Sequence, residues 1–195
     1  MTEATLVSPR FSPLALQGRP LVWQGLALVA GTLLLTLSSY ITVPMVPVPM
    51  TMQTFAVTLV GALFGWRLGG LTIIAWLIEG ASGLPVLAGG SAGIAHFFGP
   101  TGGYLFAFPV TGAVVGWLAE RGWNAHRVVL AFFAMLIGNV LCLVLGGAWL
   151  AVMIGTGPAI TAGVTPFLLG GLLKSVLGAA TLKALDRGMA KPAGR

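Results

Sequence analysis

The chain has 195 residues, of which 57% are hydrophobic and only 7% are charged. A soluble domain carries roughly 25% charged residues, so this composition excludes a soluble protein and indicates an integral membrane protein. The formal net charge is +6, but the basic residues lie near the ends of apolar segments, which is the pattern that orients membrane helices. We therefore exclude nucleic acid as a partner. The single cysteine, Cys142, rules out an internal disulfide and lies in an apolar run, where helix packing explains it.

Six apolar segments follow one another along the chain, and a membrane helix needs about 20 such residues. We predict spans at 21–42, 52–64, 68–81, 103–119, 128–154 and 166–185. The predicted fold is all-α, a polytopic membrane protein in which a compact bundle of six transmembrane helices forms one domain at 21–185. Residues 1–20 form an N-terminal tail without the form of a cleaved signal peptide, and residues 186–195 form a basic tail.

Short connections join several of these spans, and those at 43–50 and 155–165 carry no charge. Residues 43–50 contain alternating prolines, which impose a stiff, extended backbone, so this segment is predicted to be a lid or a rigid connector. Gly65, Trp66 and Arg67 are predicted to turn the chain between two short spans. Residues 155–165 are predicted to form a polar, glycine-rich turn.

The stretch at 83–106 is the most unusual part of the sequence. It has no charge, but two prolines and seven glycines prevent it from forming one continuous helix. Irregular backbone between membrane segments persists where protein or a water-filled cavity satisfies its polar groups. We therefore predict the floor of a ligand site, whereas an ordinary extramembrane loop would be richer in polar side chains.

Six spans place alternate loops on the same side of the membrane. Every basic residue except Lys174 then falls at or beyond the span ends on one side, namely Arg10, Arg19, Arg67, Arg121, Arg127, Lys183, Arg187, Lys191 and Arg195. The positive-inside rule assigns that side, and with it both termini, to the cytoplasm. We expect a multi-pass protein of the cell (inner) membrane, with the uncharged connections outside.

Two charged residues, Lys174 and Glu79, lie clearly inside predicted spans and away from the cytoplasmic ends, where a charge is expensive and commonly functional. Lys174 lies eight residues into the sixth span, about 12 Å from its outer end at 1.5 Å per residue. It could snorkel to water, but we favour a ligand contact in an outward-open cavity. Glu79 lies near the outer end of the third span and could pair with Lys174 or face water.

Neutral polar side chains are predicted in the same outer half. Each alone is more often a helix–helix hydrogen bond or a cap, but together they suggest a binding site composed of Gln53, Ser91, Thr101, Tyr104 and Asn139. Trp76 and Trp149 lie within spans, where packing explains them better than stacking on a ligand.

Several kinds of chemistry are not indicated by the sequence. His96 and His126 lack the partners and spacing of a metal site, and no nucleophile–base set, Walker loop or dinucleotide fingerprint occurs. We therefore predict no enzyme, no metal and no ATPase in this chain, so an importer would need energy from a partner. In the first span, Ala27 and Gly31 form a small-residue pair that would let another helix approach closely.

The motifs GLPV (83–86), GGSAG (89–93) and GPTGGY (99–104), with PVPMTMQ (47–53) and the run from Pro166 to Lys174, resemble the BioY family. These proteins are the biotin-specific S components of energy-coupling-factor transporters. The resemblance covers nearly the whole chain from the first span onward. It implies a six-helix bundle that captures biotin on its extracytoplasmic side and associates with a membrane coupling protein and paired cytoplasmic ATPases.

The resemblance also implies roles for particular residues. Ser91, Tyr104 and Lys174 would line the pocket with Gln53 beside the lid, and Ala27 and Gly31 would dock the coupling protein. The chain departs from the family in having Gly171 where an aspartate is common and Ser91 where some members have an amide; both positions would hold the ureido group of biotin.

These observations lead to a biotin-binding transport subunit without a covalently bound cofactor. The alternatives are an S component for another vitamin and a structural or assembly subunit without a small ligand. An intramembrane enzyme would need a polar catalytic set that the sequence lacks. The uncharged outer side with its glycine-rich floor favours the transport subunit, since a structural subunit would not require it.

Overall fold

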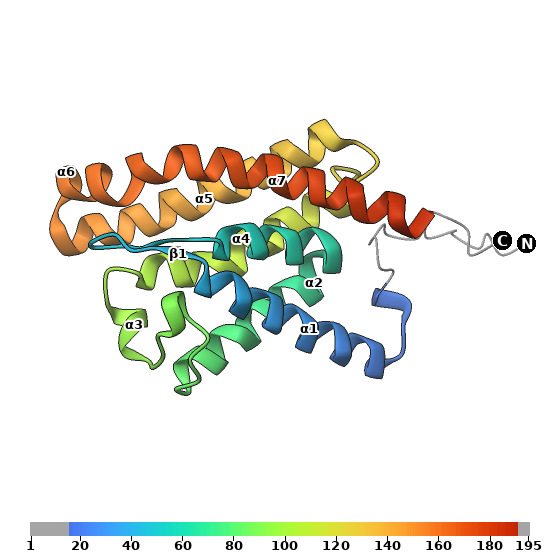
Figure 1. Cartoon of the computed structure of the whole chain (residues 1–195), viewed down its shortest axis with the longest axis horizontal. Helices are drawn as coiled ribbons and strands as arrows, with labels where there is room; N and C mark the ends of the chain where they lie inside the picture. Colours follow the sequence, from blue (N-terminus) through green and yellow to red (C-terminus); the bar gives the residue numbers. More distant parts are fainter. Residues whose placement is uncertain (1–15, 191–195) are drawn as a thin grey trace, which may run out of the picture.

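The computed structural model describes residues 16–190, which form a helical bundle with one short β-hairpin (Figure 1). The elements in chain order are η1 (Leu16–Gly18), α1 (Leu21–Tyr40), β1 (Thr42–Val43), β2 (Met50–Thr51), α2 (Gln53–Ala81), η2 (Ala88–Gly90), α3 (Ala95–Phe98), α4 (Gly102–Glu120), α5 (Val128–Ile154), α6 (Thr156–Ala159), η3 (Ile160–Val164) and α7 (Thr165–Ala190). The all-α membrane fold predicted from the sequence is confirmed.

Five helices of the described residues are long and apolar enough to cross a membrane. One of them, α2, contains a break at Gly65, whose φ of 80° and ψ of 173° are not helical. Beyond the break the chain folds back, because a Cβ added at Gly69 would lie 3.0 Å from the Cα of Gly61. Eight residues of continuous helix would separate these positions by about 12 Å. The two arms of α2, at 53–64 and 66–81, therefore supply the second and third of the six predicted segments.

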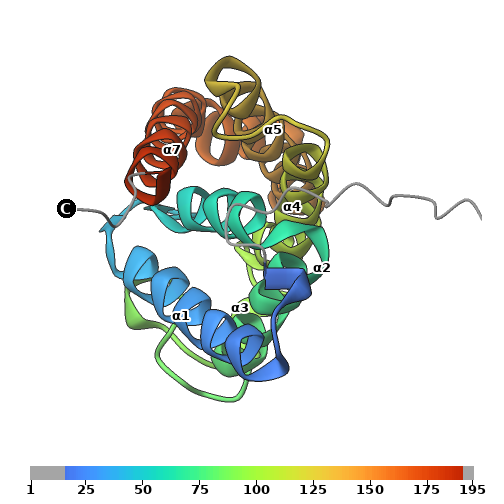
Figure 2. The same cartoon turned by 90° about the vertical axis from the view of Figure 1, so that its right-hand side faces the viewer.

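The first arm of α2 forms the centre of the bundle. Figure 2 shows it between α1 and α7, and most of its side chains are buried. Small residues allow α4 to pack closely against it, because a Cβ at Gly61 would collide with the carbonyl oxygen of Gly112. Such backbone proximity replaces the hydrophobic effect as a source of helix association in lipid.

The second arm begins at Trp66, after the break. Its backbone N–H donates to the Glu120 carboxylate at the end of α4, at 3.3 Å. This bond satisfies one of the donors that a helix start leaves free. The predicted turn at 65–67 is thus a one-residue break at Gly65, and Trp66 and Arg67 belong to the second arm.

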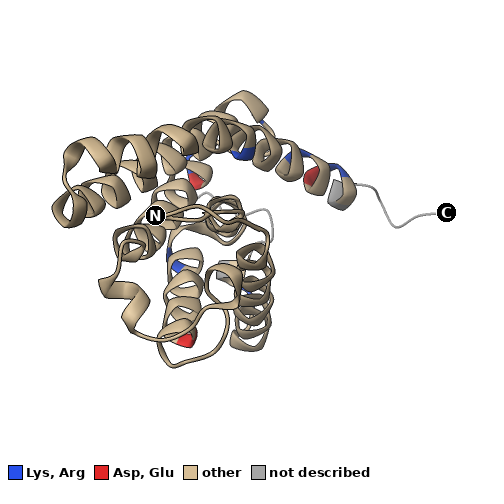
Figure 3. Ribbon diagram, turned by 60° about the vertical axis from the view of Figure 1, so that its left-hand side comes forward, with Lys and Arg blue, Asp and Glu red and all other residues tan. Residues whose placement is uncertain are grey.

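The two ends of the bundle differ in charge. The β-hairpin, α3 and α6 lie toward one end, whereas the start of α1 and the end of α7 lie toward the other (Figure 1). Figure 3 shows how few charges the bundle carries, with several gathered near the C-terminal end of α7. There Asp186 lies 3.4 Å from Lys183 and 3.6 Å from His126, so this cluster ties α7 to the connection between α4 and α5.

The prediction of a polar turn at 155–165 is wrong. The chain reverses at Gly155, with φ 90°, and α6 and η3 then lead directly into α7. Pro158 falls in the first turn of α6, where its missing N–H costs no hydrogen bond. The wider π-helical turn of η3 comes just before Pro166, whose ring would clash with the preceding turn of a regular α-helix. The Thr165 hydroxyl donates to the Ile160 carbonyl at 3.0 Å, across this turn.

Most predicted boundaries agree with the helices within a few residues, and that of α5 is identical. The last helix differs most, since α7 continues to Ala190, five residues beyond its predicted end. Of the predicted tails, residues 1–15 and 191–195 lie outside the described residues. The division of the chain into one membrane domain and two tails stays a prediction.

Candidate functional site

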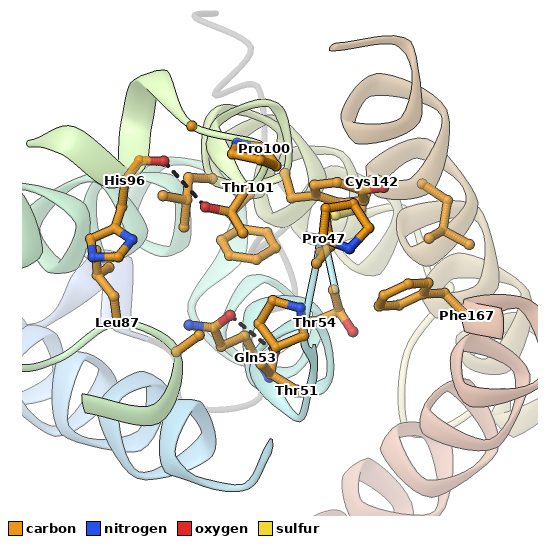
Figure 4. A pocket seen from close by; sticks show the side chains of 18 of the residues that line it. Pro47, Thr51, Gln53, Thr54, Leu87, His96, Pro100, Thr101, Cys142 and Phe167 are labelled. Carbon is orange, nitrogen blue, oxygen red and sulfur yellow. Dashed lines mark hydrogen bonds between the residues drawn. The ribbon is translucent and has the colours of Figure 1, made fainter. Parts of the chain in front are cut away.

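A cavity of about 470 Å³ lies at the end of the bundle that carries the β-hairpin and α3, and Figure 4 shows side chains that line it. Pockets for small molecules span roughly 300–1,000 Å³, so its size suits one such ligand. Its apolar wall includes Leu87, Leu105, Phe108, Leu143 and Phe167. Its polar lining includes all six side chains that the sequence predicted for the site, namely Gln53, Ser91, Thr101, Tyr104, Asn139 and Lys174.

Lys174 lines the cavity from α7 and is 9% exposed. Its ammonium group donates to the Thr51 carbonyl oxygen, and also to the Thr54 hydroxyl at 3.1 Å. The alternative pairing with Glu79 is not seen, and among residues 16–190 no carboxylate forms an ion pair with Lys174. An ammonium has three N–H donors, so one remains for a ligand.

Gln53 is the first residue of α2 and is 4% exposed. Its Oε1 accepts a hydrogen bond from the Thr51 hydroxyl at 2.9 Å, and the same hydroxyl accepts from the Gln53 backbone N–H at 3.2 Å (Figure 4). Its Nε2 is buried and makes no hydrogen bond to any described residue. A buried donor without a partner is costly, so the amide at the cavity wall requires an acceptor from a ligand or from water.

The other predicted polar residues are engaged to different degrees. The Thr101 hydroxyl donates to the His96 carbonyl at 3.2 Å (Figure 4). The Tyr104 hydroxyl donates to the Gly163 carbonyl at 2.7 Å, while its ring stacks on Phe167 with centroids 6.3 Å apart. Tyr104 therefore offers the cavity its ring rather than its hydroxyl.

The glycine-rich stretch forms one wall of the cavity. Its residues there include Leu87, Ser91 and Ala95. Two buried or half-buried indoles tie it to the bundle: Trp76 donates to the Val86 carbonyl at 3.2 Å, and Trp149 to the Gly99 carbonyl at 3.1 Å. Both tryptophans thus have hydrogen-bond partners within the chain, and these bonds satisfy backbone carbonyls of an irregular segment.

The proline segment closes another side. β1 and β2 pair in antiparallel fashion, with Thr42 opposite Thr51, and the loop between them contributes Pro47, Val48 and Pro49 to the cavity lining. Figure 4 shows Pro47 among the side chains that line the cavity. The segment therefore covers part of the cavity, and the choice between a lid and a rigid connector stays a prediction.

Sequence reasoning missed several lining residues, of which Thr51 and Thr54 matter most because they hold Lys174. Their only signal was their position around Gln53, and a threonine near a helix end usually serves its own backbone. Cys142 and His96 also line the cavity. Among residues 16–190 no group of three or more His, Cys, Asp or Glu side chains could hold a metal ion.

The two residues of the predicted docking pair, Ala27 and Gly31, differ in exposure. Ala27 is half-buried on α1, but Gly31 is buried against the second helix, where an added Cβ would lie 2.6 Å from Thr72 and 2.8 Å from Phe64. Gly31 thus serves packing within the chain, so the pair does not form an open surface for another helix. A docking role stays a prediction for Ala27.

An apolar helical bundle of membrane-spanning length, with a small-molecule cavity at one end, defines a membrane protein that holds a ligand between its helices. The BioY family model matches residues 15–191. The chain belongs to the BioY family.

Relatives that carry the BioY name come from Lactococcus lactis and Pyrococcus horikoshii. The biotin transporter BioY2 of Lactococcus lactis is 35% identical over 126 residues, which are 64% of this chain and 68% of that protein. The probable biotin transporter BioY of Pyrococcus horikoshii is 38% identical over 118 residues, 60% of this chain and 68% of that protein. The crystal structure of the S component for biotin from an ECF-type ABC transporter matches with a TM-score of 0.72 at 24% identity, covering 88% of this chain and 93% of that one.

Proposed function

We propose that this chain is the biotin-specific S component of an energy-coupling-factor importer in the cell membrane. It binds biotin and has no catalytic chemistry of its own. Membership of the BioY family supports this function, as do the relatives named as biotin transporters. The fold shared with a biotin S component is consistent with it.

The observation that carries the proposal is the polar end of the cavity. Lys174 and the unpaired amide of Gln53 both contact Thr51, so they lie near each other inside otherwise apolar walls. Biotin has a carboxylate that suits a cation, a ureido ring that suits paired donors and acceptors, and an apolar bicyclic body. The cavity offers a counterpart for each.

The direction of capture follows from charge. The cavity lies at the end that carries the uncharged connections, while Arg67, Arg121 and Arg127 lie at or near the opposite ends of their helices. By the positive-inside rule the cavity opens to the extracytoplasmic side and both termini are cytoplasmic.

Import then requires partners. The resemblance to S components and the lack of any ATP-binding motif support association with a membrane coupling protein and cytoplasmic ATPases. Because Gly31 packs within the chain, the docking hypothesis is tested with Ala27→Leu alone, which should weaken assembly with the coupling protein and leave biotin binding unchanged.

A titration of the purified chain in detergent tests the function. Biotin should bind saturably at one site, and riboflavin and thiamin should neither bind nor compete. Preferential binding of another vitamin would replace biotin as the ligand, and no binding of any vitamin would favour a structural subunit.

A further inference from the structure

Asn139 of α5 is 3% exposed, lines the cavity and is held by two contacts on its amide nitrogen. Its Nδ2 donates to the Met135 carbonyl at 3.0 Å and to the Ser175 hydroxyl oxygen at 3.1 Å. Ser175 is fully buried on α7, and its own O–H donates to the Gly171 carbonyl at 2.7 Å.

This set of contacts fixes which way the Asn139 amide is turned. A carbonyl oxygen only accepts, and a hydroxyl whose proton is already donated to Gly171 can only accept from its other neighbours. Both groups beside Asn139 therefore require its NH₂. Turning the amide over would set its oxygen against two acceptors, so the carboxamide oxygen is held on the other side.

The space for this arrangement comes from α7. Gly171 lines the cavity beside Asn139, and a Cβ added there would lie 3.6 Å from the Asn139 Cβ and 3.9 Å from its Oδ1. The Asn139 Oδ1 makes no hydrogen bond within residues 16–190. Lys174, one turn further along α7, presents donors to the same cavity. The cavity thus combines a fixed acceptor with a cationic donor.

We propose that Asn139 is a specificity-determining acceptor that receives a ligand N–H, and that Ser175 is the residue that positions it. The inference rests on the proposed function, in which the N–H is one of the ureido N–H groups of biotin. It makes the site selective for ligands that donate a hydrogen bond at this point, because an acceptor placed there would face the carboxamide oxygen.

The first test compares two fully buried serines, of which only Ser175 contacts Asn139. Ser175→Ala removes the hydroxyl that orients Asn139 and should weaken biotin binding roughly three- to tenfold, the value of one ordinary hydrogen bond. Ser39→Ala is the matched control, because Ser39 is also fully buried and also donates to a carbonyl of its own helix, at 2.7 Å from Thr36, but lies on α1 outside the cavity lining. It should leave affinity unchanged.

The second test measures specificity, which a merely structural role would not alter. The probes are the two biotin analogues in which one ureido N–H is replaced by a ring oxygen. The wild-type chain should bind at least one of them about tenfold or more weakly than biotin. In Asn139→Leu, biotin should bind more weakly and the preference for biotin over that analogue should disappear. In Ser175→Ala the same preference should become smaller.

The possible outcomes distinguish the proposed function from the proposed roles of Asn139 and Ser175. If the wild-type chain binds no biotin, the proposed function fails. If it binds biotin but Ser175→Ala and Ser39→Ala have equal affinities, or if Asn139→Leu keeps the full preference for biotin over both analogues, the positioning and acceptor roles are overturned while the function stands. Melting temperatures in detergent identify any variant whose loss of binding comes from unfolding, and for such a variant Asn139→Ser replaces Asn139→Leu.

Discussion

Replacing Lys174 by methionine tests the central feature of the site. Methionine keeps the length of the side chain and removes its charge. The ammonium has one donor left after its bonds to Thr51 and Thr54, and a hydrogen bond from a charged group contributes about 1.5–3 kcal/mol. If that donor meets biotin, affinity should fall about 10- to 150-fold.

The same substitution has an opposing effect on stability. It removes the bonds to the Thr51 carbonyl and the Thr54 hydroxyl, which costs up to about 1–3 kcal/mol, but it also removes a buried charge from a membrane helix, which is favourable. Because no carboxylate within the described residues pairs with Lys174, the variant should insert and fold, and Glu79→Gln should have no compensating effect on it.

Binding is measured by titration of purified protein with biotin and with biotinamide, whose side chain is neutral. Lys183→Met is the control on the same helix, since its 3.4 Å ion pair with Asp186 is partly exposed and such pairs contribute little. A loss of affinity for biotin alone means that the ammonium group contacts the biotin carboxylate. An equal loss of affinity for biotin and biotinamide means that it contacts the ureido ring. Unchanged affinity for both in a folded Lys174→Met protein would refute a ligand contact.

Three further predictions follow from the backbone and the ends of the bundle. Gly65→Ala should destabilise the protein by about 1–3 kcal/mol, because a φ of 80° with a ψ of 173° is accessible essentially to glycine alone; the melting temperature in detergent measures it, and an unchanged value would contradict a sharp break in α2. Tyr104→Phe should lower the free energy of unfolding by about 1 kcal/mol, because the hydrogen bond to Gly163 in η3 is lost, and should leave biotin affinity nearly unchanged. A large loss of affinity would mean that the Tyr104 hydroxyl contacts the ligand. In a Cys142→Ser background, Val46→Cys should react with an impermeant thiol reagent on intact cells and Arg121→Cys should not; the reverse labelling would invert the topology.

Much of the fold could be predicted because charged residues and glycines clearly mark the ends of the apolar segments. The long apolar run of α5 lies between the charged connection at 120–127 and Gly155, and its bounds agree with the structure. The break at Gly65 falls between the two short apolar segments at 52–64 and 68–81, which form the two arms of α2. Gln53, Asn139 and Lys174 could be predicted for a similar reason, since strongly polar side chains are rare in such spans. Ser91 and Thr101 were indicated by their place in the glycine-rich stretch.

The errors share a different cause. The segment at 155–165 looked like a turn because glycine, proline and threonine suit turns, but after the reversal at Gly155 its prolines occur at positions that a helix start or a π turn tolerates. Local composition could not reveal this, because the same residues serve both structures.

The sequence by itself determined that the chain is a helical membrane protein, where most of its segments begin and end, and which polar residues gather at one end. It could not determine which face of each helix is turned inward, because lipid and protein interior are both apolar and a membrane helix lacks the polar stripe that marks the outer face of a soluble one. Only the tertiary structure decided that Gly31 faces the interior and that the Tyr104 hydroxyl bonds to the Gly163 carbonyl. It also decided that Lys174 bonds to Thr51 and Thr54. Those contacts depend on how helices distant in sequence rotate against one another, and that rotation is set by close packing of small residues and by the need to satisfy every buried polar group.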